Sequence, residues 1–414
     1  MQKLFRNLTK FIALVMTIGL LILNLRLYHP GGAAYAQPRL GTDVVPQLRS
    51  LSSTLRTGGG DNMQALFPEG YFLTHVLYGL AWVEVGLRVE PTSAVYAEAL
   101  TEARWALARL ESSAGRAPFP ATLNPPYGVF YLGWRSWLEG GVLLMQPQGA
   151  LDPLEVEKFE KDTTTLAAAF ESSATPFLQS YTGQSWPVDN TVAIAALRLH
   201  DKLLPPKFET PITNWIVKAK SHLDPKTGLL PHRVDPRTGE ALAGARGSSQ
   251  SVINYFLIEI DPEWATEQYS LYRQQFIAPF LGVPGVREYP SGVWGLGDVD
   301  SGPLVFGFSA SATVVEIGTA QLYGDDAVAA ALIPASEAVG LPLSWGESKN
   351  YMFGLLPVGE AFLVWAKTSS RWVASPPVST WPDIVNPNWR WPFHGVALIL
   401  AGLVWWPFFR RKRN

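Results

Sequence analysis

The chain has 414 residues, of which 47% are apolar and 16% are charged, with 16 Trp and no Cys. Its formal net charge of −2 excludes the strongly basic surface of a general nucleic-acid binder. The absence of Cys excludes disulfides, thiolate metal sites and a cysteine nucleophile. The length fits one large domain or two ordinary ones, and the apolar content is enough for a large core.

The N-terminus has the pattern of an export signal. Lys3, Arg6 and Lys10 precede the apolar run Phe11–Leu23, and Ala34-Tyr35-Ala36 provides the small-x-small sequence of a cleavage site. We therefore predict that residues 1–36 are a secretory signal peptide. The stretch between the apolar run and the cleavage site is long for such a signal, so an uncleaved N-terminal anchor is the alternative interpretation.

Six loops rich in Gly, Pro, Asp or aromatic residues recur at intervals of 48 to 61 residues, and each leads into a segment that is apolar on every side. Helices of this kind belong in the buried inner ring of a closed structure. They are expected to begin near Gly70, Tyr127, Pro187, Ser248, Gly302 and Asn350.

Helices with a single apolar stripe lie between these segments. They suit an outer ring in which each helix has one solvent-exposed face. They are expected at Thr42–Thr57, Ser93–Ser112, Glu155–Ser172, Lys207–His222, Glu263–Phe280 and Asp325–Val339. The alternation predicts an all-α fold, an (α/α)6 toroid of six helix pairs over residues 42–368. One β-hairpin, Leu229–Arg233 with Glu240–Leu242, interrupts it at a Pro- and Gly-containing turn. An irregular α-solenoid is the alternative.

The C-terminal part contains a second apolar run. Residues 369–392 are rich in Pro and Trp and are expected to form a stiff stalk. Residues 393–409 have the length of a short transmembrane helix, and the basic tail 410–414 is expected in the cytoplasm. The main domain is then extracytoplasmic, either periplasmic or extracellular, and the lipid bilayer is a partner. A buried C-terminal helix is the alternative.

In a toroid of this kind the loops before the inner helices meet at one mouth, where helix N-termini favour anions. The segment Gly297–Pro303 places two carboxylates, Asp298 and Asp300, before an inner helix. Paired carboxylates carry out acid–base chemistry on glycans, so both are predicted to be catalytic. The competing interpretation is that Asp300 or Ser301 only caps the helix, with Pro303 in its first turn.

Two more residues are predicted to be catalytic. Asp189 follows Trp186 at the start of the third inner helix, where the indole is expected to stack on a sugar ring. His232 lies on the hairpin and can transfer protons near neutral pH. The competing interpretations are a helix cap or buried hydrogen-bonding group for Asp189 and a solvated loop histidine for His232.

Other residues near the predicted mouth are candidates for substrate binding, because aromatic rings stack on sugars or cover isoprenoid chains. Packing in the core is the alternative for each aromatic residue. The candidates are Tyr127, Arg135, Arg246, Trp294, Glu347 and Tyr351.

Signals for metals and cofactors are weak. The six His residues form no close pair, and a lone Asp-x-Asp is not specific for a cation. Phosphate-cradling loops and Gly-x-Ser-x-Gly elbows are absent. We predict no metal and no cofactor.

With these loops in view, the chain resembles the six-hairpin glycosidase-like (α/α)6 superfamily. The segments Trp186–Asn190 and Gly297–Pro303 are similar to a branch near the linalool dehydratase/isomerase-like proteins. The resemblance covers about residues 42–368 and implies a ring with a mouth. The chemistry of that branch relies partly on cysteines, which this chain lacks, so its activity does not carry over.

The sequence favours an exported, membrane-tethered enzyme that acts on a glycan by hydrolysis or related acid–base chemistry. An isoprenoid lyase or isomerase, with the same acids in an aromatic cavity, is the second hypothesis. A non-catalytic envelope scaffold or glycan-binding protein is the third. The expected substrate is a glycan or another extracytoplasmic small molecule, and no nucleic-acid partner is expected.

Overall fold

Six helices of the chain form a closed ring in the computed structural model, which describes residues 2–36, 38–375 and 380–410. Each packs against the next along the chain, and the last packs against the first. Because the ring closes, the predicted all-α (α/α)6 toroid is confirmed and an open solenoid is excluded. The inner helices are α4 (Gly70–Gly86), α7 (Gly128–Met145), α9 (Pro187–Leu203), α11 (Gly247–Ile260), α13 (Ala310–Tyr323) and α15 (Pro357–Thr368).

Every inner helix is covered by one helix of an outer ring. The outer helices are α2 (Val44–Arg56), α5 (Ala94–Leu110), α8 (Pro153–Ser172), α10 (Glu209–Lys220), α12 (Pro262–Phe276) and α14 (Asp326–Val339). The first of these, α2, packs on the last inner helix, α15. The beginning of the toroid is therefore joined to its end, as the two-ring arrangement requires.

The two rings differ in burial as their sequences predict. In α4 every residue except Leu73 is buried. In α5 the buried residues are Ala99, Ala103, Ala106, Leu107 and Leu110. This is a single stripe at helical spacing. The all-round apolar helices thus form the core, and the striped helices have one face in water.

Four inner helices begin within one residue of the predicted position, but two begin later. Helix α13 starts at Ala310 instead of near Gly302, and α15 starts at Pro357 instead of near Asn350. In both cases a short antiparallel hairpin takes up the preceding residues. These hairpins are β5 (Leu304–Val305) with β6 (Phe308–Ser309), and β7 (Leu343–Trp345) with β8 (Ser348–Asn350).

Two further hairpins lie in connections between helices of the ring. The predicted one is present as β1 (Arg233–Val234) and β2 (Ala241–Ala243). The other, β3 (Ile277–Phe280) with β4 (Val283–Val286), was predicted as the end of a helix. Leu281 and Gly282 have φ values of 50° and 90°, which is the geometry of a tight two-residue hairpin turn. The helix therefore ends at Phe276.

Two short helices and two 3-10 turns are the remaining elements of the described body. They are α3 (Gly59–Leu66), α6 (Ser113–Arg116), and the 3-10 turns η1 (Gly32–Ala34) and η2 (Met352–Gly354).

The segment after α15 runs across the end of the ring where the inner helices finish. Glu84 of α4 accepts hydrogen bonds from the Ser370 backbone at 2.9 Å and the Trp372 indole at 3.0 Å. Glu259 of α11 accepts hydrogen bonds from the backbone amides of residues 372–374 at 2.7 to 2.8 Å. The Trp372 ring stacks on Trp137 with centroids 4.6 Å apart. This segment closes the ring opposite the mouth.

The predicted stalk, residues 369–392, is therefore not a free spacer over its described part. Beyond the closing segment, Trp381 donates to the Tyr323 carbonyl at 2.8 Å, and Trp389 is 4% exposed. The chain follows the surface of the body because its Trp residues find apolar neighbours there. Residues 376–379 of the stalk and 411–414 of the basic tail lie outside the described residues.

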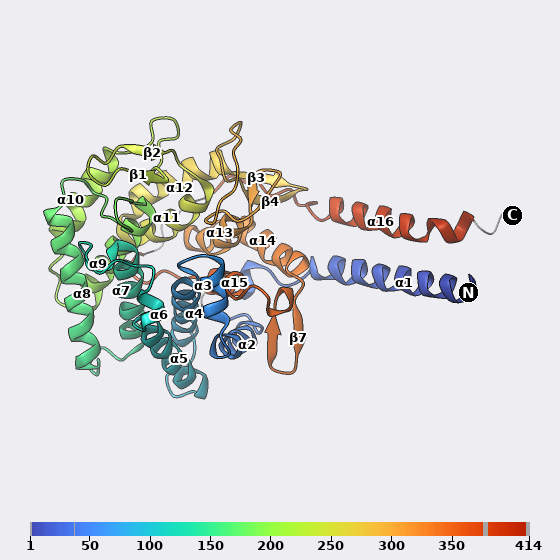
Figure 1. The fold of residues 1–414 in the computed structure, drawn as a ribbon, viewed down its shortest axis with the longest axis horizontal. Coiled ribbons are helices and arrows are strands. Elements are labelled where there is room, and N and C mark those ends of the chain that lie inside the picture. Colours follow the sequence, from blue (N-terminus) through green and yellow to red (C-terminus); the bar gives the residue numbers. More distant parts are fainter. Residues whose placement is uncertain (1, 37, 376–379, 411–414) are drawn as a thin grey trace.

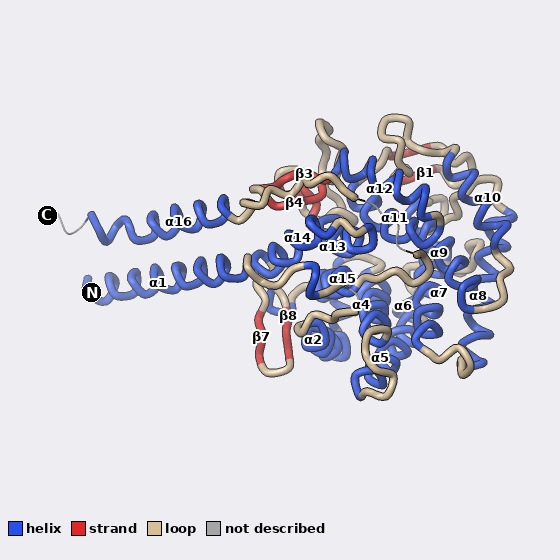
Figure 2. Tube along the Cα trace, turned by 180° about the vertical axis from the view of Figure 1, so that it is seen from behind, coloured by secondary structure: helices blue, strands red, loops and turns tan. Residues whose placement is uncertain are grey.

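Two long helices, α1 (Gln2–Arg26) and α16 (Trp391–Arg410), extend side by side from the same end of the body (Figures 1 and 2). Both are long and apolar enough to cross a membrane by length and composition, over Arg6–Arg26 and Trp391–Phe408. They run antiparallel, with both chain termini at the far end from the body (Figure 1).

Truncating the Trp372 side chain should destabilise the ring. We expect Trp372→Ala to lower the free energy of unfolding by about 3–5 kcal/mol, because it leaves a large cavity under Trp137. Chemical denaturation followed by tryptophan fluorescence measures this. The matched control is Trp345→Ala, whose side chain is 90% exposed and should change stability by less than about 0.5 kcal/mol. Equal effects of the two variants would contradict the role of Trp372.

Candidate active site at the ring mouth

Asp189 lies in the first turn of α9 and is 6% exposed. Its carboxyl group accepts a hydrogen bond from Ser180 Oγ at 2.5 Å and another from the Trp134 indole, so it does not serve as a helix cap. Burial raises the pKa of Asp189 to about 8 against these hydrogen bonds, and the charges of Asp300 and Glu69 add to the increase. Asp189 is therefore mostly protonated at neutral pH.

Asp298 organises the loop that precedes α13. Its Oδ1 accepts hydrogen bonds from the backbone amides of Asp300 at 3.1 Å and Ser301 at 3.2 Å, and its Oδ2 accepts one from Arg246. Partial burial opposes the ionisation of Asp298, but the hydrogen bond and charge of Arg246 outweigh it and lower the pKa. Asp298 is thus a fixed negative charge.

The capping interpretation of this loop is wrong. Helix α13 begins at Ala310, and its cap is Ser309, whose side chain accepts from the Ala312 amide at 3.2 Å. Neither Asp300 nor Ser301 therefore caps the helix. The Asp300 carboxyl group is left free to face the mouth.

Asp300 and His232 form a pair at the mouth. His232 Nε2 lies 3.7 Å from Asp300 Oδ2, and its Nδ1 lies 2.6 Å from Ser249 Oγ. The surrounding protein and the charge of Asp298 raise the pKa of Asp300 to about 6, although 53% of its side chain is exposed. His232 is only 5% exposed. Burial and the charge of Arg246 lower its pKa to about 4, so it is neutral at pH 7 and is not a solvated loop histidine.

Arg246 occupies the position just before α11 and is 9% exposed. Its Nε donates to Glu288 Oε1 at 2.6 Å, and its Nη1 donates to Asp298. Its Nη2 is buried without a hydrogen-bond partner. Glu288 also accepts from the Ser248 amide at 3.1 Å, so it holds both the arginine and the start of α11.

A further carboxylate, Glu69, is contributed by the residue before α4. Tyr181 donates a hydrogen bond to it, and the Tyr181 ring meets Trp186 edge-on, with centroids 5.7 Å apart. Burial and the charges of Glu69, Asp189 and Asp300 raise the pKa of Tyr181. Trp186 thus borders the group of acids, and its stacking on a sugar ring stays a prediction.

The prediction missed Glu69, Ser180, Tyr181 and Glu288. Glu69 directly precedes Gly70, where an inner helix was correctly placed, so the rule used for the other loops would have found it. The remaining three lie several residues away from a helix start and give no local signal.

Two of the predicted binding residues lie beside the site without contacting its acids. Trp294 is on the same loop as Asp298, is 72% exposed, and lies under the Arg287 guanidinium at 5.1 Å. Tyr127 is the residue before α7, and the Arg116 guanidinium lies 5.5 Å above its ring. Both remain predictions for substrate binding.

Three predicted binding residues lie in other environments. Arg135 forms ion pairs with Asp162 and Glu139 in the interface between α7 and α8. Glu347 is in the turn between β7 and β8, is 87% exposed in its side chain, and pairs with Arg49. Tyr351 donates to Glu337 in a separate buried cluster. The last two were misplaced because α15 begins later than predicted, so that these residues are in or beside a hairpin.

The ligand atoms of His232, Asp298 and Asp300 all lie within 4.8 Å of one another, which is close enough to hold a cation. Both oxygens of Asp298 already accept hydrogen bonds, from Arg246 and from loop amides. The arrangement is therefore better suited to proton transfer between acids of different pKa than to metal coordination.

No protein-family description and no curated protein matches this chain. Among solved structures, a GH76 alpha-mannanase of Bacteroides thetaiotaomicron is similar to it, with 10% sequence identity and a TM-score of 0.42. The match covers 72% of this chain and 85% of the mannanase chain. It transfers neither residues nor substrate to this chain, and it gives no support to the narrower resemblance to linalool dehydratase/isomerase-like proteins.

The protonated state of Asp189 has a measurable effect on stability. Its folded pKa of about 8 lies above its ordinary value of 3.8, so the unfolded chain releases a proton that the folded chain keeps. The contribution of this group to stability therefore falls as the pH rises from about 4 to about 8. An amide does not titrate, and Asp189→Asn should raise the melting temperature more at pH 8 than at pH 5.

Thermal unfolding at the two pH values tests this expectation. The matched control is Asp326→Asn, an exposed acid in α14, which should shift the melting temperature equally at both values. An equal shift for Asp189→Asn would contradict a protonated Asp189.

Proposed function

We propose that this protein is an enzyme that cleaves glycans by acid–base chemistry at the ring mouth. The proposal is supported chiefly by one feature of the mouth, which holds two carboxyl groups that differ in protonation state, Asp189 and Asp300. The charge of Asp300 contributes to the raised pKa of Asp189. Asp189 has a pKa of about 8 and Asp300 has a pKa of about 6. At neutral pH the first holds a proton and the second is mostly ionised. This is the combination that general acid–base catalysis requires.

The roles follow from the protonation states. Asp189 gives its proton to the oxygen of the glycosidic bond as the bond to the sugar carbon breaks. Asp300 accepts a proton from a water molecule that attacks that carbon, or attacks the carbon itself. In the hydrolytic case the water supplies a hydroxyl to one sugar and the acid supplies a proton to the other. The reaction is therefore balanced without a metal or cofactor.

The surrounding residues position these two acids. Asp298 shapes the loop by holding the amide of Asp300. His232 is neutral and its Nε2 points at Asp300, so it orients that carboxylate. Arg246 donates to Asp298 and so supports the loop that carries Asp300. Trp186 offers a partly exposed indole for stacking against a sugar ring.

The proposed location is a membrane, with the toroid on the extracytoplasmic side. Two helices of the described chain meet the length and composition of membrane spans. Their outer ends carry the basic residues: Lys3, Arg6 and Lys10 at the start, and four consecutive basic residues from Arg410 at the end. The bias of basic flanks towards the cytoplasm puts the opposite ends of both helices, and the body, on the other side.

Removing either acid should stop the reaction. We expect Asp189→Asn and Asp300→Asn each to lower kcat by about 10²-fold or more on a polysaccharide identified by screening. Asp326→Asn, on the outer helix α14, is the matched control and should keep full turnover. Circular dichroism verifies that each variant is folded. Full turnover by both mouth variants would overturn the proposal, and turnover of an isoprenoid substrate alone would favour the second hypothesis.

The rate should have a bell-shaped pH dependence. Activity needs Asp300 ionised, which is lost as the pH falls through about 6, and Asp189 protonated, which is lost as the pH rises through about 8. The pH profile of kcat/KM measures both limbs. Replacing His232 with Gln should shift mainly the acidic limb, since this side chain faces Asp300. A rate that stays constant between pH 5 and pH 9 would contradict these assignments.

A further inference from the structure

A buried ionic cluster lies at the place where the N-terminal segment enters the body. Lys349 Nζ bonds Asp43 at 2.7 Å and Glu337 at 2.8 Å. Lys367 Nζ bonds the same two carboxylates at 3.0 Å and 2.6 Å. The two positive and two negative charges balance. Since a lysine already binds each carboxylate, the cluster has no vacancy for a metal ion.

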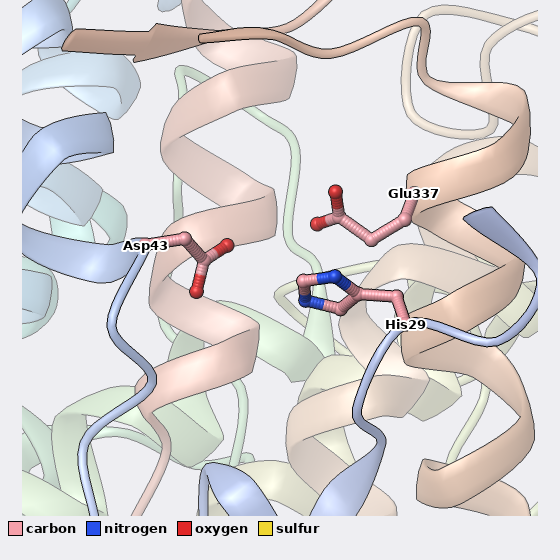
Figure 3. Close-up of side chains that lie close together, drawn as sticks. All are labelled: His29, Asp43 and Glu337. Atoms are coloured by element: carbon pink, nitrogen blue, oxygen red, sulfur yellow. The ribbon is translucent and has the colours of Figure 1, made fainter. Parts of the chain in front are cut away.

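Residues of the N-terminal segment complete this cluster. The Tyr35 hydroxyl donates to Asp43 Oδ1 at 2.7 Å, and His29 Nε2 lies 2.9 Å from the same hydroxyl. Figure 3 shows His29, Asp43 and Glu337 pointing towards one another from three different parts of the chain. Tyr35 is 1% exposed. It is therefore a core residue, and its hydroxyl occupies one of the lone pairs of Asp43.

The backbone around Tyr35 is also fitted to the body. A Cβ atom at Gly31 would meet the Ala330 carbonyl of α14 at 2.7 Å, and one at Gly41 would meet the Tyr35 ring at 2.1 Å. Arg26 Nη2 donates to the Pro342 carbonyl at 2.5 Å. The segment between α1 and α2 thus lies in close contact with α14 and is part of the fold.

These contacts bear on the candidate cleavage site. Cutting after Ala36 would remove both His29 and Tyr35. Asp43 would lose a hydrogen-bond donor, and a cavity the size of a tyrosine ring would open beside Lys367, whose Nζ lies 5.6 Å from that ring. Asp43 would keep its two lysine partners, but emptying a core site is strongly destabilising.

The helix that leads into this segment is itself paired with the C-terminal helix. Arg390 Nε donates to the Leu27 carbonyl at 2.8 Å, at the end nearest the body. The side-chain contacts along the pair are His394 Nδ1 with Asn24 Oδ1 at 2.6 Å, His394 Nε2 with Tyr28 Oη at 2.9 Å, and Trp405 Nε1 with Thr17 Oγ1 at 2.8 Å. Polar contacts between helices at several levels fix their register.

The outer surface of this pair is apolar. Phe11, Leu21 and Leu25 of α1 are 59 to 63% exposed, and Leu398 and Ile399 of α16 are 74% and 64% exposed. The two helices satisfy their polar groups by contacts with each other and expose apolar side chains elsewhere. This arrangement suits a lipid environment.

We propose that the N-terminal segment is retained in the mature protein and that α1 and α16 form a two-helix membrane anchor. The tethered toroid would then be held by both ends of its chain, with Tyr35 and the ionic cluster fixing the first helix to the body. This inference rests on the membrane location of the proposed function and is independent of its chemistry, so loss of turnover would leave it intact.

Retention of the segment is tested on the full chain with one epitope at each end. After expression and isolation of membranes, we expect both epitopes on a single species of full length in the membrane fraction. A product that carries the C-terminal epitope, lacks the N-terminal one and is shorter by the first 36 residues would overturn the proposal. Turnover measured on the same preparation tests the proposed function separately.

Pairing of the helices is tested by disulfide cross-linking, for which the chain is well suited because it has no Cys. A protease site placed in the exposed turn after Asp235 separates the two halves of the chain. With Asn24→Cys and His394→Cys, an oxidant should keep the halves joined on a non-reducing gel. The control pair is Leu25→Cys with Val396→Cys, which lies at the same level but is 63% and 46% exposed.

We expect several-fold more cross-linking for the facing pair than for the control pair. Equal yields for the two pairs, or none for the facing pair in a chain that retains both epitopes, would overturn the paired anchor.

Discussion

Closure of the inner ring is the constraint on which the rest of this structure depends. Helices that are apolar on all sides, such as α4, have no stable position unless neighbours cover every face. The first and last inner helices, α4 and α15, cover each other because they are in contact. The same closure brings their starting points together, so Glu69, Asp189 and Asp300 meet although they come from distant parts of the chain. The site is a consequence of how the core is packed.

The sequence was sufficient for the architecture and for most of the mouth, since both depend on periodic patterns. Asp189 was singled out because it lies at a helix start that an apolar run reveals. Asp300 was singled out by the same rule, although α13 begins only at Ala310. Arg135 was misassigned because periodicity does not say which side of a buried helix meets Asp162 of the outer ring. Tyr351 was misassigned because a hairpin of polar residues delayed the helix that follows it. Errors thus arose where tertiary contacts or short strands override local pattern.

The three aspartates at the mouth differ in protonation state because their surroundings differ. Asp189 is enclosed by neutral donors, so desolvation dominates and the group keeps its proton. Asp298 is partly exposed and bonded to Arg246, so the ionised form dominates. Asp300 lies between these limits, because burial and the charge of Asp298 raise its pKa while the charge of Arg246 lowers it. Sequence spacing identifies three carboxylates, but only their surroundings decide which one keeps its proton and which one is a fixed charge.

The N-terminal segment and the closure of the ring share the same residues. Asp43 is the residue before α2, the first outer helix, and Lys367 lies near the end of α15, the last inner helix. Their ion pair therefore sits on the seam where the toroid closes, and Tyr35 links that seam to the helix outside the body. Displacing the N-terminal segment would disturb Asp43, and through it the packing of α2 on α15. The seam is therefore held by a buried ionic cluster in addition to apolar contacts.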